Sequence, residues 1–225
     1  MRHLVLGAGQ VGTAVADVLA DVGEVTLRDI EPTDGRADVL HVCIPWRPEF
    51  VDDVRAAVDQ HRTRLVIVHS TVPVGTCDPH GWVHSPVRGR HPDLAPSLRT
   101  FTKHFGGARA HEAADLWAPI SKTVAHPRAA ETEAGKLWEL VQYGLQVRVC
   151  QAIYEWCHER GLDPATVYKQ FAQEYNVGYA TLGYGRFVRP VLDYVPGPIG
   201  GHCVARNAPM IDHPIAEVVQ HGWEA

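Results

Sequence analysis

The chain has 225 residues, a formal net charge of −5, and a composition that is 45% hydrophobic and 21% charged. These values are typical of a globular protein with one large or two modest domains. The mild acidity, without a long basic run, argues against a nucleic-acid or membrane-surface partner. No apolar run reaches the roughly 20 residues that a membrane-spanning helix needs, and the N-terminal segment has no signal-peptide cleavage site.

The five cysteines are scattered and odd in number, and the sequence contains no CxxC pair. Reduced thiols in the cytoplasm are the simplest interpretation of this pattern. The fourteen histidines include no HExxH motif, and we predict no metal site.

In chain order, short apolar runs alternate with segments of helical periodicity. Strands are predicted at 3–6, 24–30, 37–45, 64–70, 81–85 and 102–107, and helices at 10–21 and 47–62. This alternation predicts an α/β fold, with a Rossmann-like and mostly parallel sheet in a domain of residues 1–127. Only a short segment separates strand 24–30 from strand 37–45, where a full Rossmann half has a helix and a further strand. We therefore expect a shortened sheet that lacks one edge βα unit.

Residues 128–225 are predicted to form a second, helical domain. One long helix is expected over 129–161, with Gly161 ending it. Asp163 and Pro164 then begin another helix, and the Gly-, Tyr- and Pro-rich stretch 176–203 is expected to be loop with short helical turns. Because the long helix carries several aromatic residues, we expect it to pair with a second copy in a homodimer.

The segment GAGQVG follows the first strand and opens the first helix, as a dinucleotide-binding motif requires. Its first glycine allows the tight turn, its second lets the backbone approach a pyrophosphate, and its third lets the helix pack on the strand. Asp29 ends the next strand, where a carboxylate binds ribose hydroxyls and favours NAD over NADP. The alternative is a structural glycine turn that binds nothing. The cofactor-binding residues predicted from this motif are Gly7, Gly9, Gln10, Val11, Gly12 and Asp29.

Further motifs in the same order resemble the UDP-glucose/GDP-mannose dehydrogenase family, within the 6-phosphogluconate dehydrogenase-like superfamily. They are GAGQVG, ADVLHVCIP, HSTVPVGT, HSPVRG, EAGKLWEL and PGPIGGHC, and they span nearly the whole chain. The resemblance implies a nicotinamide-dependent oxidation of a sugar-nucleotide primary alcohol to a carboxylate, using two NAD molecules. It also implies that Ile44, Pro45, Ser70 and Thr71 contact the cofactor.

The resemblance implies a catalytic role for three residues. Cys203 would attack an aldehyde and hold it as a thiohemiacetal, which a second hydride transfer converts to a thioester for hydrolysis. Lys136 would stabilise negative charge on the substrate oxygen or move its proton. Thr71, after the carboxyl end of a strand, would hold the catalytic water or the nicotinamide region.

The chain also differs from the family's pattern. Val87, Leu140 and Asn207 stand where the family has glutamate, asparagine and aspartate, and the 225 residues hold no counterpart of the family's C-terminal UDP-binding domain. We therefore expect a truncated and divergent relative.

Two other functions stay open at this point. One is a two-electron dehydrogenase of the β-hydroxyacid type, in which Lys136 matters and Cys203 does not. The other is a non-catalytic NAD-binding relic with a sensing or partner-binding role. Correspondingly, Cys203 could be a small packed residue and Lys136 a solvated charge on a helix.

Overall fold

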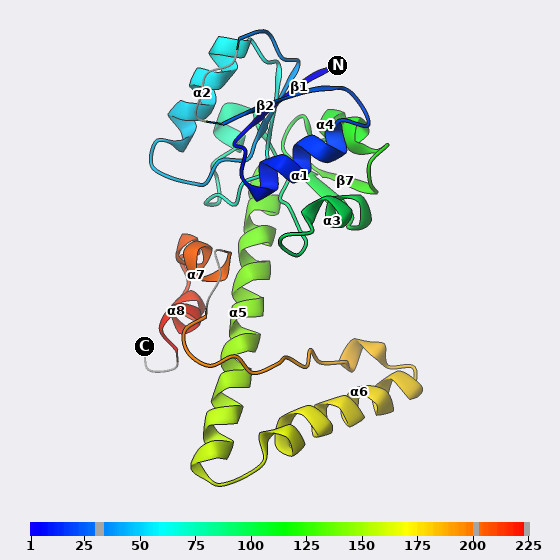
Figure 1. The fold of residues 1–225 in the computed structure, drawn as a ribbon, viewed down its shortest axis with the longest axis vertical. Helices are drawn as coiled ribbons and strands as arrows, with labels where there is room; N and C mark the ends of the chain where they lie inside the picture. The colour runs from blue at the N-terminus through cyan, green and yellow to red at the C-terminus, as the bar shows by residue number, and fades with distance from the viewer. Residues whose placement is uncertain (30–33, 200–202, 223–225) are drawn as a thin grey trace. The chain divides into compact units, whose positions relative to one another are not determined.

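A computed structural model describes residues 1–29, 34–199 and 203–222 (Figure 1). The chain forms two compact units, Met1–Lys136 and Leu137–Ala225. The predicted domains, 1–127 and 128–225, stay a prediction, because compact packing alone does not show that a segment folds independently. No helix among the described residues is both long and apolar enough to cross a membrane.

The first unit contains a seven-stranded sheet in the order β2-β1-β3-β4-β5-β6-β7. Neighbouring strands are parallel except β5 and β6, which are antiparallel. This confirms the predicted α/β fold with a mostly parallel, Rossmann-like sheet. The strands are β1 (Arg2–Leu6), β2 (Glu24–Arg28), β3 (Val39–Val42), β4 (Leu65–Val68), β5 (Val83–His84), β6 (Lys103–Gly106) and β7 (Thr123–His126). Within the described part of the chain, β2 is the edge strand, as expected for a sheet without the additional βα unit.

Helices cover both faces of this sheet (Figure 1). One face packs under α1 (Gln10–Leu19), α3 (Leu94–Thr100) and α4 (Ala110–Trp117), and the other under α2 (Phe50–His61). Because strand side chains alternate, the odd-numbered residues of β1, β3 and β4 face the first layer and the even-numbered ones the second. Burial on both faces explains the continuous apolar runs of β3 and β4.

Four described elements of the first unit were not predicted: α3, α4, β7 and a 3-10 turn (Asp78–His80). Each is short, and α4 packs an alanine-rich face against the sheet, which gives only a weak periodic signal. The predicted bounds were also too wide, since strand 37–45 covers only Val39–Val42 and helix 47–62 begins at Phe50. Ile30, the predicted last residue of strand 24–30, lies outside the described residues.

The long helix α5 (Ala129–Glu159) is confirmed, and its first turns belong to the first unit. A residue far away in sequence caps its beginning: the Asp78 carboxylate accepts hydrogen bonds from the backbone N–H groups of Ala129 (2.8 Å) and Ala130 (3.2 Å). A carboxylate at this position satisfies otherwise unpaired N–H groups and complements the positive end of the helix dipole.

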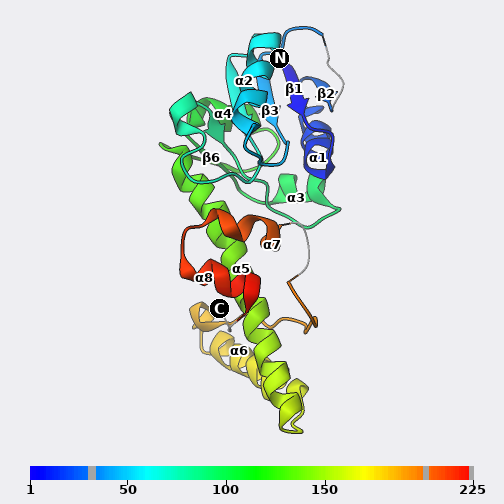
Figure 2. The ribbon, with the colours of Figure 1, turned by 90° about the vertical axis from the view of Figure 1, so that its left-hand side faces the viewer.

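The second unit is helical (Figure 2). After α5 it contains a π-helical turn (Ala165–Gln170), α6 (Phe171–Thr181), a 3-10 turn (Gly185–Phe187), α7 (Val204–Asn207), a second 3-10 turn (Ala208–Met210) and α8 (Pro214–His221). The predicted loop 176–203 was therefore wrong at its start, because α6 continues to Thr181. The core of this unit packs α5 against the last helices through Leu140, Val141, Val204, Ala208, Ala216 and Val219.

Candidate functional site

The glycine loop between β1 and α1 has the geometry that its motif predicts. Gly7 has φ 103°, a conformation that favours glycine, and its N–H donates to the Arg28 carbonyl at 2.7 Å. A Cβ atom at Gly12 would overlap the carbonyl oxygen of Gly7. Both glycines are therefore required by the protein's own packing, and the loop is held tightly against the end of β1.

Gly9 differs from the other two glycines. A Cβ atom placed there would meet no protein atom within 4 Å. The loop is therefore open on the side where a pyrophosphate would approach, and Gly9 is the N-cap of α1. The first turn of α1, described in full, holds no acidic residue that would repel an anion. These observations fit a dinucleotide phosphate above this loop.

Asp29 lies next to the same loop, where its carboxylate accepts a hydrogen bond from the Ala8 N–H at 3.4 Å. The side chain is exposed, as a group that binds ribose hydroxyls must be before a ligand arrives. Arg28 points away toward α2, where its guanidinium contacts Gln60 (3.0 Å) and the His61 ring (3.2 Å). The guanidinium of Arg28 is therefore engaged on α2, whereas the Asp29 carboxylate lies beside the glycine loop.

The other predicted cofactor residues lie along the same edge, at the carboxyl ends of β3 and β4. The side chain of Ile44 packs against Gly7, and the Ser70 hydroxyl donates to the Ile44 carbonyl at 2.5 Å. Pro45 follows as an exposed residue, and Thr71 follows Ser70 as a half-buried one. The residues predicted to bind the cofactor, from Gly7 to Thr71, thus lie side by side along one edge of the sheet. Open α/β sheets bind their ligands at this edge.

The loop after Thr71 is fixed by a buried carboxylate that the sequence analysis did not identify. Glu133, in the second turn of α5, is fully buried and accepts hydrogen bonds from the N–H groups of Gly75 (2.7 Å) and Cys77 (2.8 Å). Together with the Asp78 cap, this contact joins the loop to the first turns of α5. The only signal in the sequence was Glu133 in a matching motif, which gave no reason to expect a backbone partner.

His84 connects this loop to the helix face that carries Lys136. Its Nε2 lies 3.2 Å from the Ser70 carbonyl and its Nδ1 lies 2.9 Å from the Thr132 hydroxyl. A carbonyl only accepts, so Nε2 carries the proton and Nδ1 accepts from Thr132. Burial lowers the pKa of His84 to about 3, and the charges of Lys103 and Lys136 lower it too.

Lys136 lies one helical turn after Thr132 and is half-buried. Its charge is one of the causes that lower the pKa values of His84 and Lys103. Thr71 and Lys136 therefore belong to one region of the first unit, joined by His84 and Ser70. The catalytic role of Lys136 stays a prediction.

A row of buried histidines crosses the sheet on the α1 face. His3 Nδ1 lies 3.1 Å from His41 Nε2, His41 Nδ1 lies 3.0 Å from His69 Nε2, and His69 Nδ1 lies 2.9 Å from the Ser85 carbonyl. Burial lowers the pKa of all three, most strongly for His41 and His69, so the row is neutral. Because the Ser85 carbonyl only accepts, each ring must donate from Nδ1 to the next, and one carbonyl sets all three tautomers.

Lys103 bonds to the same Ser85 carbonyl as His69, the last histidine of the row. Its ammonium donates to the carbonyls of Ser85 (3.0 Å) and Pro86 (3.2 Å) and lies over the Trp117 ring, 5.1 Å from its centroid. Burial lowers the pKa of Lys103 from 10.5 to about 7. The row and Lys103 thus fix the backbone at Ser85, next to Val87, which is buried in the apolar core. Among the described residues, no group of three or more His, Cys, Asp or Glu side chains could hold a metal ion.

Cys203 belongs to the second unit. It precedes α7 and is half-buried, with its side chain packed against the cluster that contains Leu140 and Val141. The Asn207 amide donates to the Cys203 carbonyl at 2.8 Å, and Leu140 is a core residue of this unit. Val87, Leu140 and Asn207, the three departures from the motifs of the resembling family, therefore all have structural roles here. His202 and the two preceding glycines lie outside the described residues.

No protein-family model matches the sequence, and no curated protein matches it. Solved structures with the same fold were found. UDP-D-ManNAc dehydrogenase from Pyrococcus horikoshii matches with a TM-score of 0.82 and 17% identity, over 100% of this chain and 68% of that one. UDP-N-acetyl-mannosamine dehydrogenase from Staphylococcus aureus matches with a TM-score of 0.75 and 16% identity, over 97% of this chain and 66% of that one.

A shorter enzyme also has this fold. The 3-hydroxyisobutyrate dehydrogenase of Mycobacterium tuberculosis matches with a TM-score of 0.68 and 17% identity, over 97% of this chain and 90% of that one. At these identities the matches show the fold alone. The chain has the fold of the UDP-sugar and GDP-mannose dehydrogenases and spans about two thirds of their length.

Proposed function

We propose that this protein is an NAD-dependent oxidoreductase that oxidises an alcohol or aldehyde, with sugar- and nucleotide-sugar-derived compounds as the first candidates. The observation that carries the proposal is the contiguous set at the carboxyl edge of the sheet. It combines the open side of Gly9, the carboxylate of Asp29, and Ser70 bonded to Ile44. The fold shared with solved dehydrogenases supports the same conclusion.

NAD is preferred over NADP in this proposal because of the charges beside the glycine loop. Asp29 would accept hydrogen bonds from ribose hydroxyls and would repel a 2′-phosphate. Arg28, the nearest cation in sequence, is engaged by Gln60 and His61 on α2. Titration of both cofactors with a tryptophan-fluorescence readout tests this preference, and tighter binding of NADP would contradict it.

The bound nicotinamide would supply the hydride acceptor. In the proposal, Lys136 stabilises the negative charge that develops on the substrate oxygen, or takes its proton. Thr71 positions the nicotinamide or a water molecule, since its loop is fixed by Glu133 and by the Ser70–His84 contact. A rigid loop suits this role because it costs little reorganisation when the substrate reacts.

The proposed role of Cys203 is covalent. The Cys203 thiolate would form a carbon–sulfur bond to an aldehyde, and the resulting alkoxide would be protonated to a thiohemiacetal. Transfer of the hydrogen on that carbon as a hydride to a second NAD, with loss of the hydroxyl proton, would give a thioester. Water would then release the carboxylate and return the thiol. A half-buried thiol at the beginning of a helix is a reasonable position for such a nucleophile.

A two-electron dehydrogenase is the second candidate, and the match to 3-hydroxyisobutyrate dehydrogenase favours it. The chain covers 90% of that enzyme, and Val87, Leu140 and Asn207 replace polar residues that a four-electron reaction would use. In this reaction Lys136 would act alone, and Cys203 would be a packing residue beside Leu140 and Val141.

Product stoichiometry distinguishes the candidates. The protein is incubated with NAD and a panel of UDP-sugars, GDP-mannose and short 3-hydroxy acids, and NADH is counted per substrate consumed. Two NADH, with activity lost in both Cys203→Ser and Lys136→Met, supports the covalent route. One NADH with an active Cys203→Ser variant supports the two-electron route. NAD binding without turnover of any substrate would leave the non-catalytic role.

We also propose a homodimer formed through the long helix 129–161, in the cytoplasm, where the five cysteines stay reduced. Exposed aromatic and aliphatic side chains on α5, including Trp138, Tyr143, Val149 and Trp156, support this interface. Light scattering at micromolar concentration should give a dimer mass, and Tyr143→Ser with Val149→Ser should give a monomer. Val74→Ser, an exposed valine in the first unit, is the control. A monomeric wild-type protein would exclude the dimer.

A further inference from the structure

The segment that leads to Cys203 has almost no regular structure. Residues 188–198, here called the strap, form no described helix or strand. Pro190, Pro196 and Pro198 lack backbone N–H groups, so this segment cannot pair along its length as a β-strand. Its path must therefore be set by other contacts.

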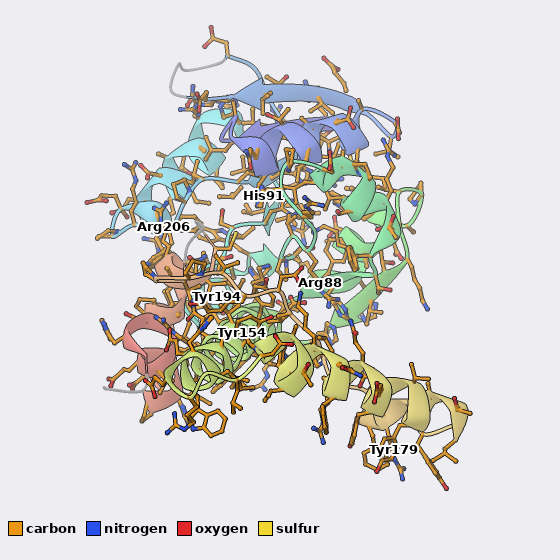
Figure 3. The ribbon with its side chains drawn as sticks, turned by 60° about the horizontal axis from the view of Figure 1, so that its bottom comes forward. Arg88, His91, Tyr154, Tyr179, Tyr194 and Arg206 are labelled. Atoms are coloured by element: carbon orange, nitrogen blue, oxygen red, sulfur yellow. The ribbon has the colours of Figure 1, made fainter. Side chains whose placement is uncertain are left out.

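Side chains from the π-helical turn, α5 and α6 make those contacts. The Asn176 amide bonds to both the N–H and the carbonyl of Arg189, at 2.8 Å each. The Tyr168 hydroxyl accepts from the N–H of Leu192 at 2.9 Å. Tyr154 stacks on Tyr194, with ring centroids 4.6 Å apart and planes within 1° of parallel (Figure 3). The first part of the strap is thus fixed along these helices.

The last part of the strap, immediately before the Cys203 loop, is held by Gln151. This residue is only 5% exposed, and its Nε2 donates to the carbonyls of Val195 (2.8 Å) and Gly197 (2.7 Å). Its Oε1 accepts from Arg148 Nη1 at 3.1 Å. The amide orientation is unambiguous, because the strap carbonyls only accept and the guanidinium only donates. All the polar groups of the Gln151 side chain are used.

Arg148 extends the same network to the other side of Cys203. Its Nε and Nη2 donate to the carbonyls of Val219 (3.2 Å) and Gln220 (3.0 Å) in the last turn of α8. α8 follows Cys203 in the sequence and packs in the same apolar cluster as α7. The guanidinium therefore satisfies carbonyls at a helix C-terminus, where a cation is electrostatically favoured.

We propose that Arg148 and Gln151 are positioning residues for Cys203. They bind the chain on both sides of the cysteine, at residues 195–197 and 219–220, and thereby set where the backbone places the thiol. A nucleophile needs such support, since a displacement of about 1 Å in an active site lowers the rate by roughly a hundredfold. The inference rests on the proposed covalent role of Cys203 for its meaning in catalysis.

The test replaces Gln151 with glutamate. Gln151→Glu has nearly the same volume and keeps an acceptor for Arg148, but it has no N–H for the two strap carbonyls. Gln142→Glu, at an exposed position of α5, is the matched control with the same change of charge. The alkylation rate of Cys203 by iodoacetamide is measured by peptide mass spectrometry, with the buried Cys77 and Cys157 as internal references. Amide hydrogen exchange is measured in the strap.

We expect Gln151→Glu to change the alkylation rate of Cys203 on the order of tenfold and to speed exchange at Leu192–Val195. Gln142→Glu should match the wild type. Turnover should fall in Gln151→Glu with the KM for NAD unchanged. If Gln151→Glu folds and both its Cys203 alkylation and its strap exchange equal those of the wild type, the inference is wrong.

A second variant covers the case in which Gln151→Glu does not fold. Arg148→Lys keeps the charge but loses the planar set of guanidinium donors. It should change Cys203 alkylation and strap exchange in the same direction as Gln151→Glu, by a smaller factor. No change in either quantity would contradict the inference. The two proposals also fail separately. An active Cys203→Ser variant would remove the covalent role of Cys203, whereas the alkylation readout of Gln151→Glu would still test the positioning.

Discussion

In the first unit, four helices and a seven-stranded sheet bury two apolar layers, and Glu133 and Asp78 bond the segment after β4 to the beginning of α5. In the second unit, a long helix carries a small apolar cluster, and much of the remaining chain is held by single side chains that bond to backbone carbonyls. The layered packing of the first unit should tolerate most single substitutions outside the core. The path of the chain in the second unit depends on a few residues such as Gln151 and Asn176. The predictions below test this difference, in order of expected effect.

The largest effect on function, the loss of cofactor binding, should come from the glycine loop of the first unit. Gly12→Ala places a methyl group onto the Gly7 carbonyl, so we expect a loss of about 1–3 kcal/mol in the free energy of unfolding and no measurable NAD binding. Gly9→Ala meets no protein atom, so it should keep the stability and lose only the cofactor. Urea denaturation and NAD titration of the two variants measure both quantities. Equal loss of stability in both variants would contradict this division of roles.

The second effect concerns pH. The buried His41, His69 and His84 have lowered pKa values, whereas the unfolded residues titrate near 6.5. Below pH 6.5 the unfolded chain therefore binds protons that the folded chain excludes. The free energy of unfolding should fall between pH 7 and 5, by up to about 1.4 kcal/mol per pH unit for each of these histidines. Urea denaturation at several pH values measures the slope, and a flat profile would refute it.

Lys103 should act in the same direction at higher pH. Its pKa is about 7 in the folded protein and 10.5 in the unfolded chain, so the free energy of unfolding should rise as the pH rises above 7. Lys103→Met removes this group and should flatten the profile between pH 7 and 9, while the slope below pH 6.5 stays. An unchanged slope above pH 7 would show that Lys103 is not its origin.

A more local effect is expected at Glu133, which lies near the end of the first unit and bonds the loop after Thr71. Glu133→Gln replaces one acceptor oxygen by an NH2 group that faces a backbone N–H, at a cost of about 1–3 kcal/mol. The exposed Glu155→Gln on the same helix is the control and should cost nothing. Amide exchange should localise the change to residues 71–77. Faster exchange only in the second unit would be inconsistent with the contact.

The smallest effect is expected at Asn207. Asn207→Asp turns the donor that bonds the Cys203 carbonyl into a second acceptor, so we expect a loss of about 1 kcal/mol. Asn207→Ser, which keeps a donor, should lose less. Thermal unfolding with near-UV detection compares them, and a stabilised Asn207→Asp variant would show that the carboxylate finds another donor.

Much of the first unit followed from the sequence because its signals are local. A short stretch of sequence is enough to recognise the glycine motif, the apolar runs of β3 and β4, and the long helix. The residues predicted to bind the cofactor follow strand ends, where open α/β sheets bind ligands, and their contact with a cofactor stays a prediction. The hydrogen bonds that hold the loops at this edge of the sheet were not predictable, because the partners of Glu133, Asp78 and His84 lie far away in sequence.

The second unit was predicted less well. Its strap has no period, and the prolines and glycines there indicate only what the segment does not form. Gln151 and Arg148 occupy ordinary positions of a helical pattern, and nothing in that pattern indicates that their partners are carbonyls of residues 195–197 and 219–220. The role predicted for Cys203 came from a matching motif, and its local contacts alone fit packing as well as catalysis.

The buried histidine row has a consequence for how this sequence can change over time. Because one carbonyl sets the donor and acceptor of three rings in series, replacing His41 alone deprives both His3 and His69 of a partner. Such groups show strong mutational coupling, since a half-satisfied network is costlier than an apolar one. Three positions, one on β1, one on β3 and one directly after β4, are therefore expected to change together. The three histidines should be replaced together, because a variant that keeps only one or two of them has buried ring nitrogens without partners and is disfavoured.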